Sequence, residues 1–344
     1  MSPPGKKAAT PAAPKAPPAA PPTSAAPQVE IHELSIPLEA RGERLDVVLA
    51  QLLPQYSRAR LQRWIDGGRV LLDGLKPARR ALVRGGQQVR IEAEFLPDER
   101  VQAGAPAVPF RIVHRDAAIL VIDKPAGLVV HPGAGISAGT LQNALLELEP
   151  QLAKVPRAGI VHRLDKDTSG LLVIARTPQA QASLVRALAA HEVRREYLAL
   201  CQGVMTGGGT IDEPIGRHRT QRTRMAVRGD GREAVTHYRI ERRFRAHTLA
   251  RVQLETGRTH QIRVHLAHVG HPVVGDPVYG GRRRAPAAAS AALLESLAGF
   301  RRQALHAARL GLTHPTSGRE LEFEAPLPKD FVALLDALEA AETA

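Results

Sequence analysis

Hydrophobic side chains recur at two different spacings near the start of the chain, and each spacing predicts a different element. Residues 44–53 and 57–66 carry apolar positions three or four residues apart, which predicts two short helices. Apolar residues at 70–72 and alternating ones at 87–94 predict two strands, and an Asp-Gly pair typical of a hairpin turn follows the first. We therefore expect a compact unit over residues 41–95.

A second and larger unit follows, in which predicted strands outnumber predicted helices. The two kinds of element are not regularly interleaved, which favours an α+β fold with a largely antiparallel, mixed sheet over residues 110–335. The expected strands are residues 118–123, 171–175, 195–203, 237–244 and 247–255, and the expected amphipathic helix is residues 177–193.

Three segments are expected to lie outside these elements. Residues 1–28 are almost entirely Ala, Pro, Lys, Ser and Thr, which cannot bury enough apolar surface to offset their ordering entropy. We expect a disordered tail that extends to the front unit, over residues 1–40 in all. Residues 96–109, with prolines among small side chains, are expected to be a linker, and residues 281–300 an inserted, partly mobile loop.

The charge balance narrows the choice of partner. The chain carries 47 Lys and Arg against 34 Asp and Glu, a formal net charge of +13, and only eight of the 47 are Lys. A planar guanidinium suits phosphates and base edges, so a polyanionic partner is favoured, most simply nucleic acid, with an anionic membrane surface as the other option. The sequence shows neither an 18-residue apolar run nor an apolar signal-peptide core. We therefore expect a cytoplasmic protein that does not enter membranes.

Basic side chains gather on the second predicted helix and on the strands after it. A charge run is often only a solvated face, but here the sign is nearly uniform, which favours phosphate binding. We interpret Trp64, on the same helix, as a core residue and not as a stacking platform. The basic residues expected to contact nucleic acid are Arg58, Arg60, Arg63, Arg69 and Lys76.

Cysteine and histidine usage argues against a metal site. The single cysteine, Cys201, excludes an intrachain disulfide and a site built from several thiolates, and it follows an apolar run typical of a core strand. Four histidines lack the i, i+4 spacing of the helical zinc motif, so we expect them to serve polar packing and nucleic-acid contacts. These histidines are His260, His265, His268 and His271.

The segment GIVHRLDKDTSGLLVIAR, residues 159–176, is the strongest candidate for chemistry. It places Asp165 at the start of a polar turn that leads into an apolar strand, and side chains on turns held by rigid strands often carry function. Two other interpretations stay open. Asp165 pairs with Arg163 or caps the turn, or Asp165 and Asp167 bind a metal in a nuclease, although no third acidic ligand stands at a convincing spacing.

Five sequence motifs connect these observations. They are VVHPGAG (129–135), VPRAGIVHRLDKDTSG (155–170), REYLA (195–199), ETGRTHQIRVH (255–265) and GDPVYGG (275–281). Together they resemble the RluA family of RNA pseudouridine synthases, from about residue 41 to 335. The resemblance implies a small αL RNA-binding domain followed by a pseudouridine synthase catalytic domain.

The resemblance also implies a role for each matching residue. Asp165 matches the family's essential Asp, which attacks the ribose or abstracts its 2′ hydrogen, so that the uracil detaches, turns and rejoins through carbon five. Tyr197 matches the Tyr that packs on the target base and is implicated in removing the proton from carbon five. Arg263 matches the Arg that pairs with the Asp. Arg163 matches the Arg that fills the space left by the extruded base.

Elementary chemistry agrees with these roles. An Asp that acts as nucleophile or base must be ionised, and a nearby Arg, which cannot lose its proton, favours that form. A base must leave its helix before it can rotate, at a cost of roughly a few kcal/mol, and a flat guanidinium can stack in the vacated slot. Lys124 begins a further matching segment, 124–127, which we expect to support the site. Because neither redox nor phosphoryl chemistry is involved, no cofactor is expected.

The resemblance is most detailed to members that act on large-subunit ribosomal RNA. It implies specific uridines of 23S ribosomal RNA as substrates, in the stem-loop called helix 69, either on free RNA or on the assembling large subunit. We expect a monomer. The alternative is a non-catalytic RNA-binding factor for ribosome assembly on the same fold. The joint presence of Asp165, Tyr197 and Arg263 argues against that alternative, because a binding module needs no such set.

Overall fold

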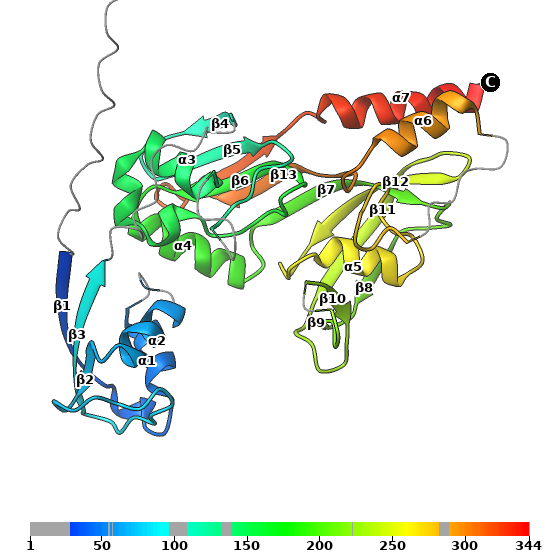
Figure 1. The fold of residues 1–344 in the computed structure, drawn as a ribbon. Coiled ribbons are helices and arrows are strands. Elements are labelled where there is room, and N and C mark those ends of the chain that lie inside the picture. The colour runs from blue at the N-terminus through cyan, green and yellow to red at the C-terminus, as the bar shows by residue number, and fades with distance from the viewer. Residues whose placement is uncertain are drawn as a thin grey trace, which may run out of the picture.

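The computed structural model describes residues 28–53, 56, 58–95, 109–132, 139–221, 223–281 and 289–343. They form a front unit over residues 28–95 and a larger unit over residues 109–343 (Figure 1). The expected linker at 96–109 falls outside the described residues except for its last residue, and residues 1–27 of the expected tail fall outside them as well.

The front unit is a three-stranded antiparallel sheet with two helices. Its strand order is β1-β3-β2, and the buried core includes Leu49 and Leu61. Trp64 is 6% exposed in the same core, which confirms the predicted core position. The elements are β1 (Gln28–Ser35), a 3-10 turn (Leu38–Ala40), α1 (Leu45–Leu52), α2 (Arg58–Asp66), β2 (Val70–Leu72) and β3 (Gln88–Phe95).

The expected tail over residues 1–40 is wrong for its last part, because residues 28–40 belong to the front unit. β1 pairs with β3 along its whole length, and Ile36 then enters the core at 2% exposure. The composition argument applies only to the Pro- and Ala-rich residues before β1. An edge strand joins its neighbour through backbone hydrogen bonds, so it needs no strongly apolar sequence of its own.

The larger unit is built on one nine-stranded sheet. The strand order is β4-β5-β6-β13-β7-β12-β11-β8, with β14 paired to β13 beside this path. Among the described strands only β6 and β13 are parallel neighbours, which confirms the predicted α+β fold with a largely antiparallel, mixed sheet. The strands are β4 (Arg111–Arg115), β5 (Ile119–Lys124), β6 (Ser169–Ala175), β7 (Arg194–Gln202), β8 (Gly209–Asp212), β11 (Val235–Arg243), β12 (His247–Leu254), β13 (Leu305–Thr313) and β14 (Glu320–Glu324), and β9 (Ile215–Arg217) pairs separately with β10 (Met225–Val227).

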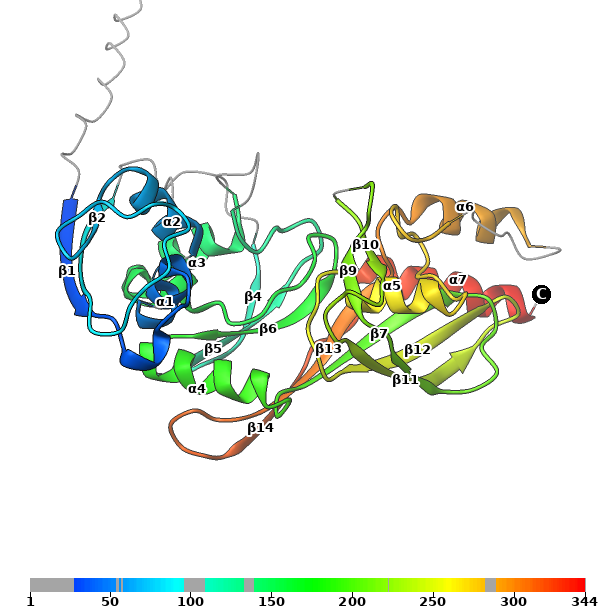
Figure 2. The same cartoon turned by 90° about the horizontal axis from the view of Figure 1, so that it is seen from below.

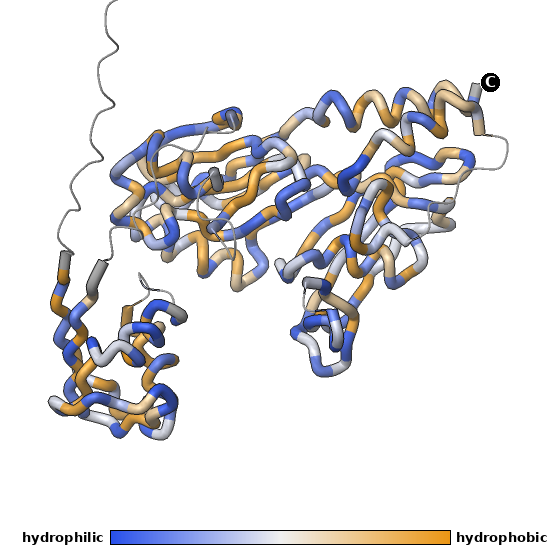
Figure 3. Tube along the Cα trace, in the orientation of Figure 1, coloured by the Kyte–Doolittle hydropathy of each residue, from blue (hydrophilic) through white to orange (hydrophobic). Residues whose placement is uncertain are grey.

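Helices cover both faces of the β5–β6 part of this sheet (Figure 2). Leu172 and Ile174 share a buried cluster with α3 (Leu141–Leu148), whereas Val173 and Ala175 share one with α4 (Pro178–Ala189). Burial on both faces explains why β6 is a continuous apolar run, and hydrophobic residues line β5 and β6 in Figure 3. Two 3-10 segments, Pro150–Lys154 and Pro156–Gly159, follow α3, and α5 (Gln261–His268) packs against β10 and β11.

Two C-terminal expectations are wrong. The segment expected as a loop over 281–300 contains the helix α6 (Ala291–Gly299), while residues 282–288 lie outside the described residues. Ser290 caps α6, and the helix contains several alanines, the residue with the highest helix propensity. The unit does not end at residue 335, because α7 (Lys329–Thr343) continues and buries Leu338. None of the helices in the described part of the chain is long and apolar enough to cross a membrane.

A short parallel contact joins the two halves of the large sheet. β6 meets β13 at two positions, where Ser169 lies opposite His306 and Gly170 lies opposite Ala307. Gly170 has a φ of +112°, and a Cβ atom at this position would lie 2.2 Å from the carbonyl oxygen of Ala307. Only glycine fits both the dihedral angle and the close approach of the two backbones.

Gly170→Ala is therefore expected to lower the free energy of unfolding by about 2–5 kcal/mol, from backbone strain and overpacking together. Gly207→Ala is the matched control, because a Cβ there meets nothing within 4 Å, and it should stay within about 0.5 kcal/mol of the wild type. Chemical denaturation of both variants checks this. Equal stability of the two would show that the β6–β13 contact can open without cost.

Candidate active site

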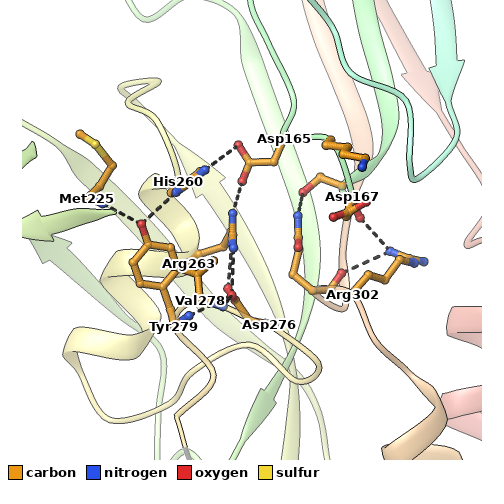
Figure 4. Close-up of polar contacts among 12 residues, drawn as sticks. Asp165, Asp167, Met225, His260, Arg263, Asp276, Val278, Tyr279 and Arg302 are labelled. Atoms are coloured by element: carbon orange, nitrogen blue, oxygen red, sulfur yellow. Dashed lines mark hydrogen bonds and ion pairs between the residues drawn. The ribbon is translucent and has the colours of Figure 1, made fainter. Parts of the chain in front are cut away.

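A cleft of about 410 Å³ lies where the turn before β6, the strand β7 and the helix α5 come together. Asp165 is in the turn, Tyr197 is on β7 and Arg263 is in the first turn of α5, and all three line the cleft. Figure 4 shows Asp165 and Arg263 pointing toward one another. The structure thus brings together the three residues predicted to be catalytic.

A buried lysine holds the turn that carries Asp165. The Nζ atom of Lys124 is 2.9 Å from each of the carbonyl oxygens of Pro125, Leu128 and Lys166, and the side chain is fully buried. Burial lowers the pKa of Lys124 to about 7, although Asp167 and Asp165 act in the opposite direction. Because Lys166 directly follows Asp165, this lysine fixes the turn, which supports the prediction that Lys124 acts through the site's structure.

Arg263 is shared between two carboxylates. Its Nε and Nη2 atoms donate to Asp276 at 2.7 and 2.9 Å, and its Nη1 atom donates to Oδ2 of Asp165 at 2.9 Å. Burial alone would lower the pKa of Arg263, but the two acids raise it overall. Asp165 thus forms its ion pair with Arg263, as the resemblance implied, and not with Arg163.

Tyr197 belongs both to the core and to the cleft. It is 5% exposed and sits on β7 between Val252 of β12 and Ala307 of β13. Burial raises the pKa of Tyr197, so the phenol stays protonated at neutral pH. Cys201, on the same strand, is fully buried, which confirms the core position predicted for it.

Two further arginines line the cleft. Arg163 is exposed at the cleft. Arg195, to which the motif analysis gave no role, is 7% exposed, and its recorded partners are the backbone carbonyl oxygens of Leu254 and Glu255. Its Nε atom is buried without a hydrogen-bond partner. A buried guanidinium beside Tyr197 adds positive charge to the floor of the cleft.

His260 and Tyr279 complete the constellation. The sequence predicted polar packing and nucleic-acid contacts for His260 and gave Tyr279 no role. His260 directly precedes α5 in a left-handed conformation, with φ +58°, and its Nε2 atom is 3.9 Å from Oδ1 of Asp165. Its Nδ1 atom is 2.8 Å from the hydroxyl oxygen of Tyr279. Tyr279 and Asp276 both lie in the GDPVYGG motif, so the signal was visible in the sequence, but only the fold shows what these residues contact.

The other histidines of the motif region differ in burial and in hydrogen bonding. His265 is fully buried and bonded to Thr236 and to the carbonyl oxygen of Glu213, and His271 is bonded to the carbonyl oxygen of Gln202. Polar packing is thus confirmed for these two, and His268 is exposed. Within the described ranges, no three His, Cys, Asp or Glu side chains form a group that could hold a metal ion.

The basic residues of the front unit are partly engaged within the unit. Arg58 donates from Nε to the buried Asp46 at 2.7 Å, and the Arg60 guanidinium carbon lies 5.9 Å from the centre of a Trp64 ring. Burial raises the pKa of Asp46, but Arg58 and its neighbours lower it overall. Arg58 still exposes 47% of its side chain. Phosphate contact by these residues stays a prediction.

Each of the two units matches a known protein family. Residues 118–268 match the family model described as RNA pseudouridylate synthase, and residues 43–76 match that of the S4 domain. A solved structure of the human protein RNA Pseudouridylate Synthase Domain Containing 4 superimposes with a TM-score of 0.53 at 30% identity, covering 66% of this chain and 92% of that one.

Relatives of known name match nearly the whole chain. The ribosomal large subunit pseudouridine synthase D of Xanthomonas campestris pv. campestris is 52% identical over 308 residues, which is 90% of this chain and 92% of the relative. The protein of the same name from Pseudomonas aeruginosa is 55% identical over 303 residues, covering 88% and 94%. That of Escherichia coli K12 is 55% identical over 302 residues, covering 87% and 91%.

Arg263→Ala is expected to lower the free energy of unfolding by about 3–5 kcal/mol, because the buried Asp276 carboxylate loses its partner. Turnover should fall much further than RNA affinity. The double variant Arg263→Ala/Asp276→Asn should recover stability but not turnover. Denaturation and single-turnover kinetics check this.

Arg251→Ala is the control for that experiment. Arg251 is also mostly buried, at 14% exposure, and pairs with Glu196 and Glu241, but it does not line the cleft. The Arg251→Ala variant should have a lower free energy of unfolding and an unchanged rate of turnover. If Arg263→Ala weakened RNA binding at an unchanged rate, Arg263 would belong to the binding surface instead.

Proposed function

Because the chain belongs to the RNA pseudouridine synthase family, we propose that it isomerises specific uridines of large-subunit ribosomal RNA to pseudouridine. The observation that carries this proposal is the 52–55% identity, over about nine-tenths of the chain, to enzymes named for that subunit. We assign the target to the stem-loop helix 69, on the resemblance of the motifs to members that act there. The compartment of ribosome synthesis, the cytoplasm, is the expected location.

Asp165 is assigned as the essential catalytic group. Arg263 holds one of its carboxylate oxygens, Oδ2, which leaves Oδ1 toward the cleft. From there the carboxylate attacks the ribose or takes its 2′ hydrogen, and the carbon–nitrogen bond to uracil breaks. The base turns and rejoins through carbon five, and as this bond forms Asp165 releases the ribose or returns the 2′ hydrogen. The proton of carbon five then leaves, and the nitrogen that first held the ribose gains one. One carbon–nitrogen bond is exchanged for a carbon–carbon bond without net oxidation, so the isomerisation needs no cofactor.

Tyr197 and Arg163 are assigned to the flipped nucleotide. The cleft volume of about 410 Å³ lies within the roughly 300–1,000 Å³ typical of small-ligand pockets, which suits one extruded nucleotide. The Tyr197 ring offers a face for the uracil. We assign its hydroxyl to the removal of the proton from carbon five, which a protonated phenol can accept only as it gives up its own proton. Arg163 is exposed, so its guanidinium can fill the gap that the extruded base leaves in the RNA stack.

The front unit is assigned to RNA binding. It matches the S4 domain, and it carries Arg58, Arg60, Arg63, Arg69 and Lys76. Both the cleft and the front unit belong to one chain, and we therefore expect a monomer to be active. Free RNA and RNA on the assembling large subunit are both candidate substrates, and both present the same phosphates to these side chains.

Asp165→Asn is expected to abolish isomerisation while RNA affinity stays within about threefold, because Asn keeps the shape of the side chain and loses its charge. Pseudouridine is mapped on ribosomal RNA from cells whose only copy of the gene is wild type, Asp165→Asn or Asp167→Asn. The signal in helix 69 should vanish with Asp165→Asn and persist with Asp167→Asn, the matched change in the same turn. A normal pseudouridine level with Asp165→Asn would support the non-catalytic assembly factor.

Removal of residues 1–95 is expected to weaken RNA binding and to make it less sensitive to salt. Each phosphate that the front unit neutralises should contribute roughly 0.7–0.9 to the slope of log affinity against log salt. The remaining chain retains Asp165, Tyr197 and Arg263 and should keep some activity on short RNA at high concentration. Equal slopes for the full-length and shortened proteins would show that the basic residues form only a solvated face.

A further inference from the structure

His260 and Asp165 face each other across the cleft without a direct hydrogen bond. Nε2 of His260 is 3.9 Å from Oδ1 of Asp165, which is too far for one. Both side chains are mostly buried, at 19% and 16% exposure, and both line the cleft. Because Arg263 occupies Oδ2, the oxygen that faces His260 is also the oxygen available to a substrate.

The hydrogen bonds of Tyr279 decide which nitrogen of His260 carries the proton. The Tyr279 oxygen accepts the backbone N–H of Met225 at 2.9 Å, which leaves its own proton for Nδ1 of His260 at 2.8 Å (Figure 4). Burial raises the pKa of Tyr279, so the hydroxyl keeps that proton near neutral pH. This arrangement favours Nδ1 as the acceptor, in which case the neutral ring carries its hydrogen on Nε2.

The surroundings keep this ring neutral and fixed. Burial lowers the pKa of His260, with Arg263 and Arg163 acting in the same direction and Asp165 and Asp276 opposing them. The left-handed backbone of His260 is uncommon for a residue other than glycine, and such conformations persist where neighbouring contacts hold them. The edge-on contact with the Tyr279 ring, at 5.6 Å between centroids, is one such contact.

One donor and one acceptor, 3.9 Å apart, are complementary to a group that accepts one hydrogen bond and donates another. A hydroxyl is such a group. A nucleotide inside an RNA chain has one free hydroxyl, the ribose 2′-OH, because its 3′ and 5′ oxygens are esterified. The same hydroxyl is what lets a protein distinguish RNA from DNA at a given position.

We propose that His260 binds the ribose of the target nucleotide: its Nε2–H donates to the 2′-OH, which in turn donates to Oδ1 of Asp165. This assignment rests on the proposed pseudouridine synthase activity and names the substrate atom that the site recognises. The bridge holds the sugar against Asp165 and selects ribose over deoxyribose. The bridge is compatible with both routes. The 2′ hydrogen is on the carbon that bears this hydroxyl, and attack on the ribose takes place at the adjacent carbon, which holds the base.

The test is a thermodynamic cycle between His260 and the 2′-OH. Dissociation constants are measured for RNA stem-loops that carry pseudouridine or 2′-deoxypseudouridine at the target, because the enzyme consumes neither. With the wild type, loss of the hydroxyl removes two hydrogen bonds, one of them to a carboxylate, and should weaken binding more than about 10-fold. His260→Ala removes only one of the two, so it should weaken binding of the ribose form about 5-fold and that of the deoxy form less than twofold. Equal losses on the two RNAs would overturn the proposal.

Three variants separate ribose recognition from a merely structural role. His131→Gln is the matched control, since His131 lines the same cleft but is bonded to Gln142, and its effect should be equal on both RNAs. The coupling is the extra loss of affinity that His260→Ala causes on the ribose form compared with the deoxy form. His260→Gln, whose amide can donate a hydrogen bond, should keep part of this coupling. Tyr279→Phe keeps the ring but removes the hydroxyl, so the coupling should be smaller in that variant.

The tautomer is read directly by nitrogen-15 NMR of the His260 ring, assigned by difference against His260→Gln. The wild type should show the hydrogen on Nε2, and Tyr279→Phe a mixture of tautomers. A wild-type ring with its hydrogen on Nδ1 would refute the proposal. Failure of the wild type to convert uridine would count against the proposed activity alone, because the binding cycle uses RNA that already carries the product.

Discussion

The sharing of the Arg263 guanidinium between two carboxylates is the interaction on which the cleft depends. Asp276 accepts hydrogen bonds from two nitrogens of this guanidinium and from the backbone N–H groups of Val278 and Tyr279. The Asp276 carboxylate therefore fixes the position of the guanidinium. The Tyr279 ring lies 5.0 Å from the same guanidinium. Asp165 is therefore met by a cation whose position is already set, which is how an active site avoids reorganising during a reaction.

The turn that carries Asp165 is held by residues next to both strands that flank β6, which are β5 and β13. Lys124, at the end of β5, binds its backbone from one side. From the other side, Gln303 donates to the Thr168 hydroxyl at 3.0 Å, and Arg302 donates to the carbonyl oxygen of Asp167. Gln303 and Arg302 lie just before β13. The position of the reacting carboxylate thus depends on the contact between β6 and β13, and a change in packing there is transmitted to the chemistry.

The pattern of apolar residues predicted seven of the fourteen described strands, and β13 was among those it missed. The motifs were sufficient to predict which residues meet in the cleft. The errors have physical causes. β1 was missed because pairing through the backbone leaves little trace in composition. α6 was missed because its small alanines mark out no clear apolar face. The hydrogen-bond partners of Asp276 and His260 depend on the residue at which α5 begins and on the left-handed backbone of His260. The hydrophobic periodicity of the sequence predicts neither feature.

The late position of β13 in the chain has a consequence for folding. Ser169 and His306, which meet where β6 joins β13, are 137 residues apart, and β13 fills the middle of the sheet between β6 and β7. At roughly 5–20 residues per second of synthesis, about 7–27 s separate the appearance of these two residues at the ribosome. During that interval both β6 and β7 have an open edge. A nascent chain therefore has to keep two hydrophobic half-sheets apart from other chains until β13 is synthesised, which makes this stage of its synthesis the one most exposed to aggregation.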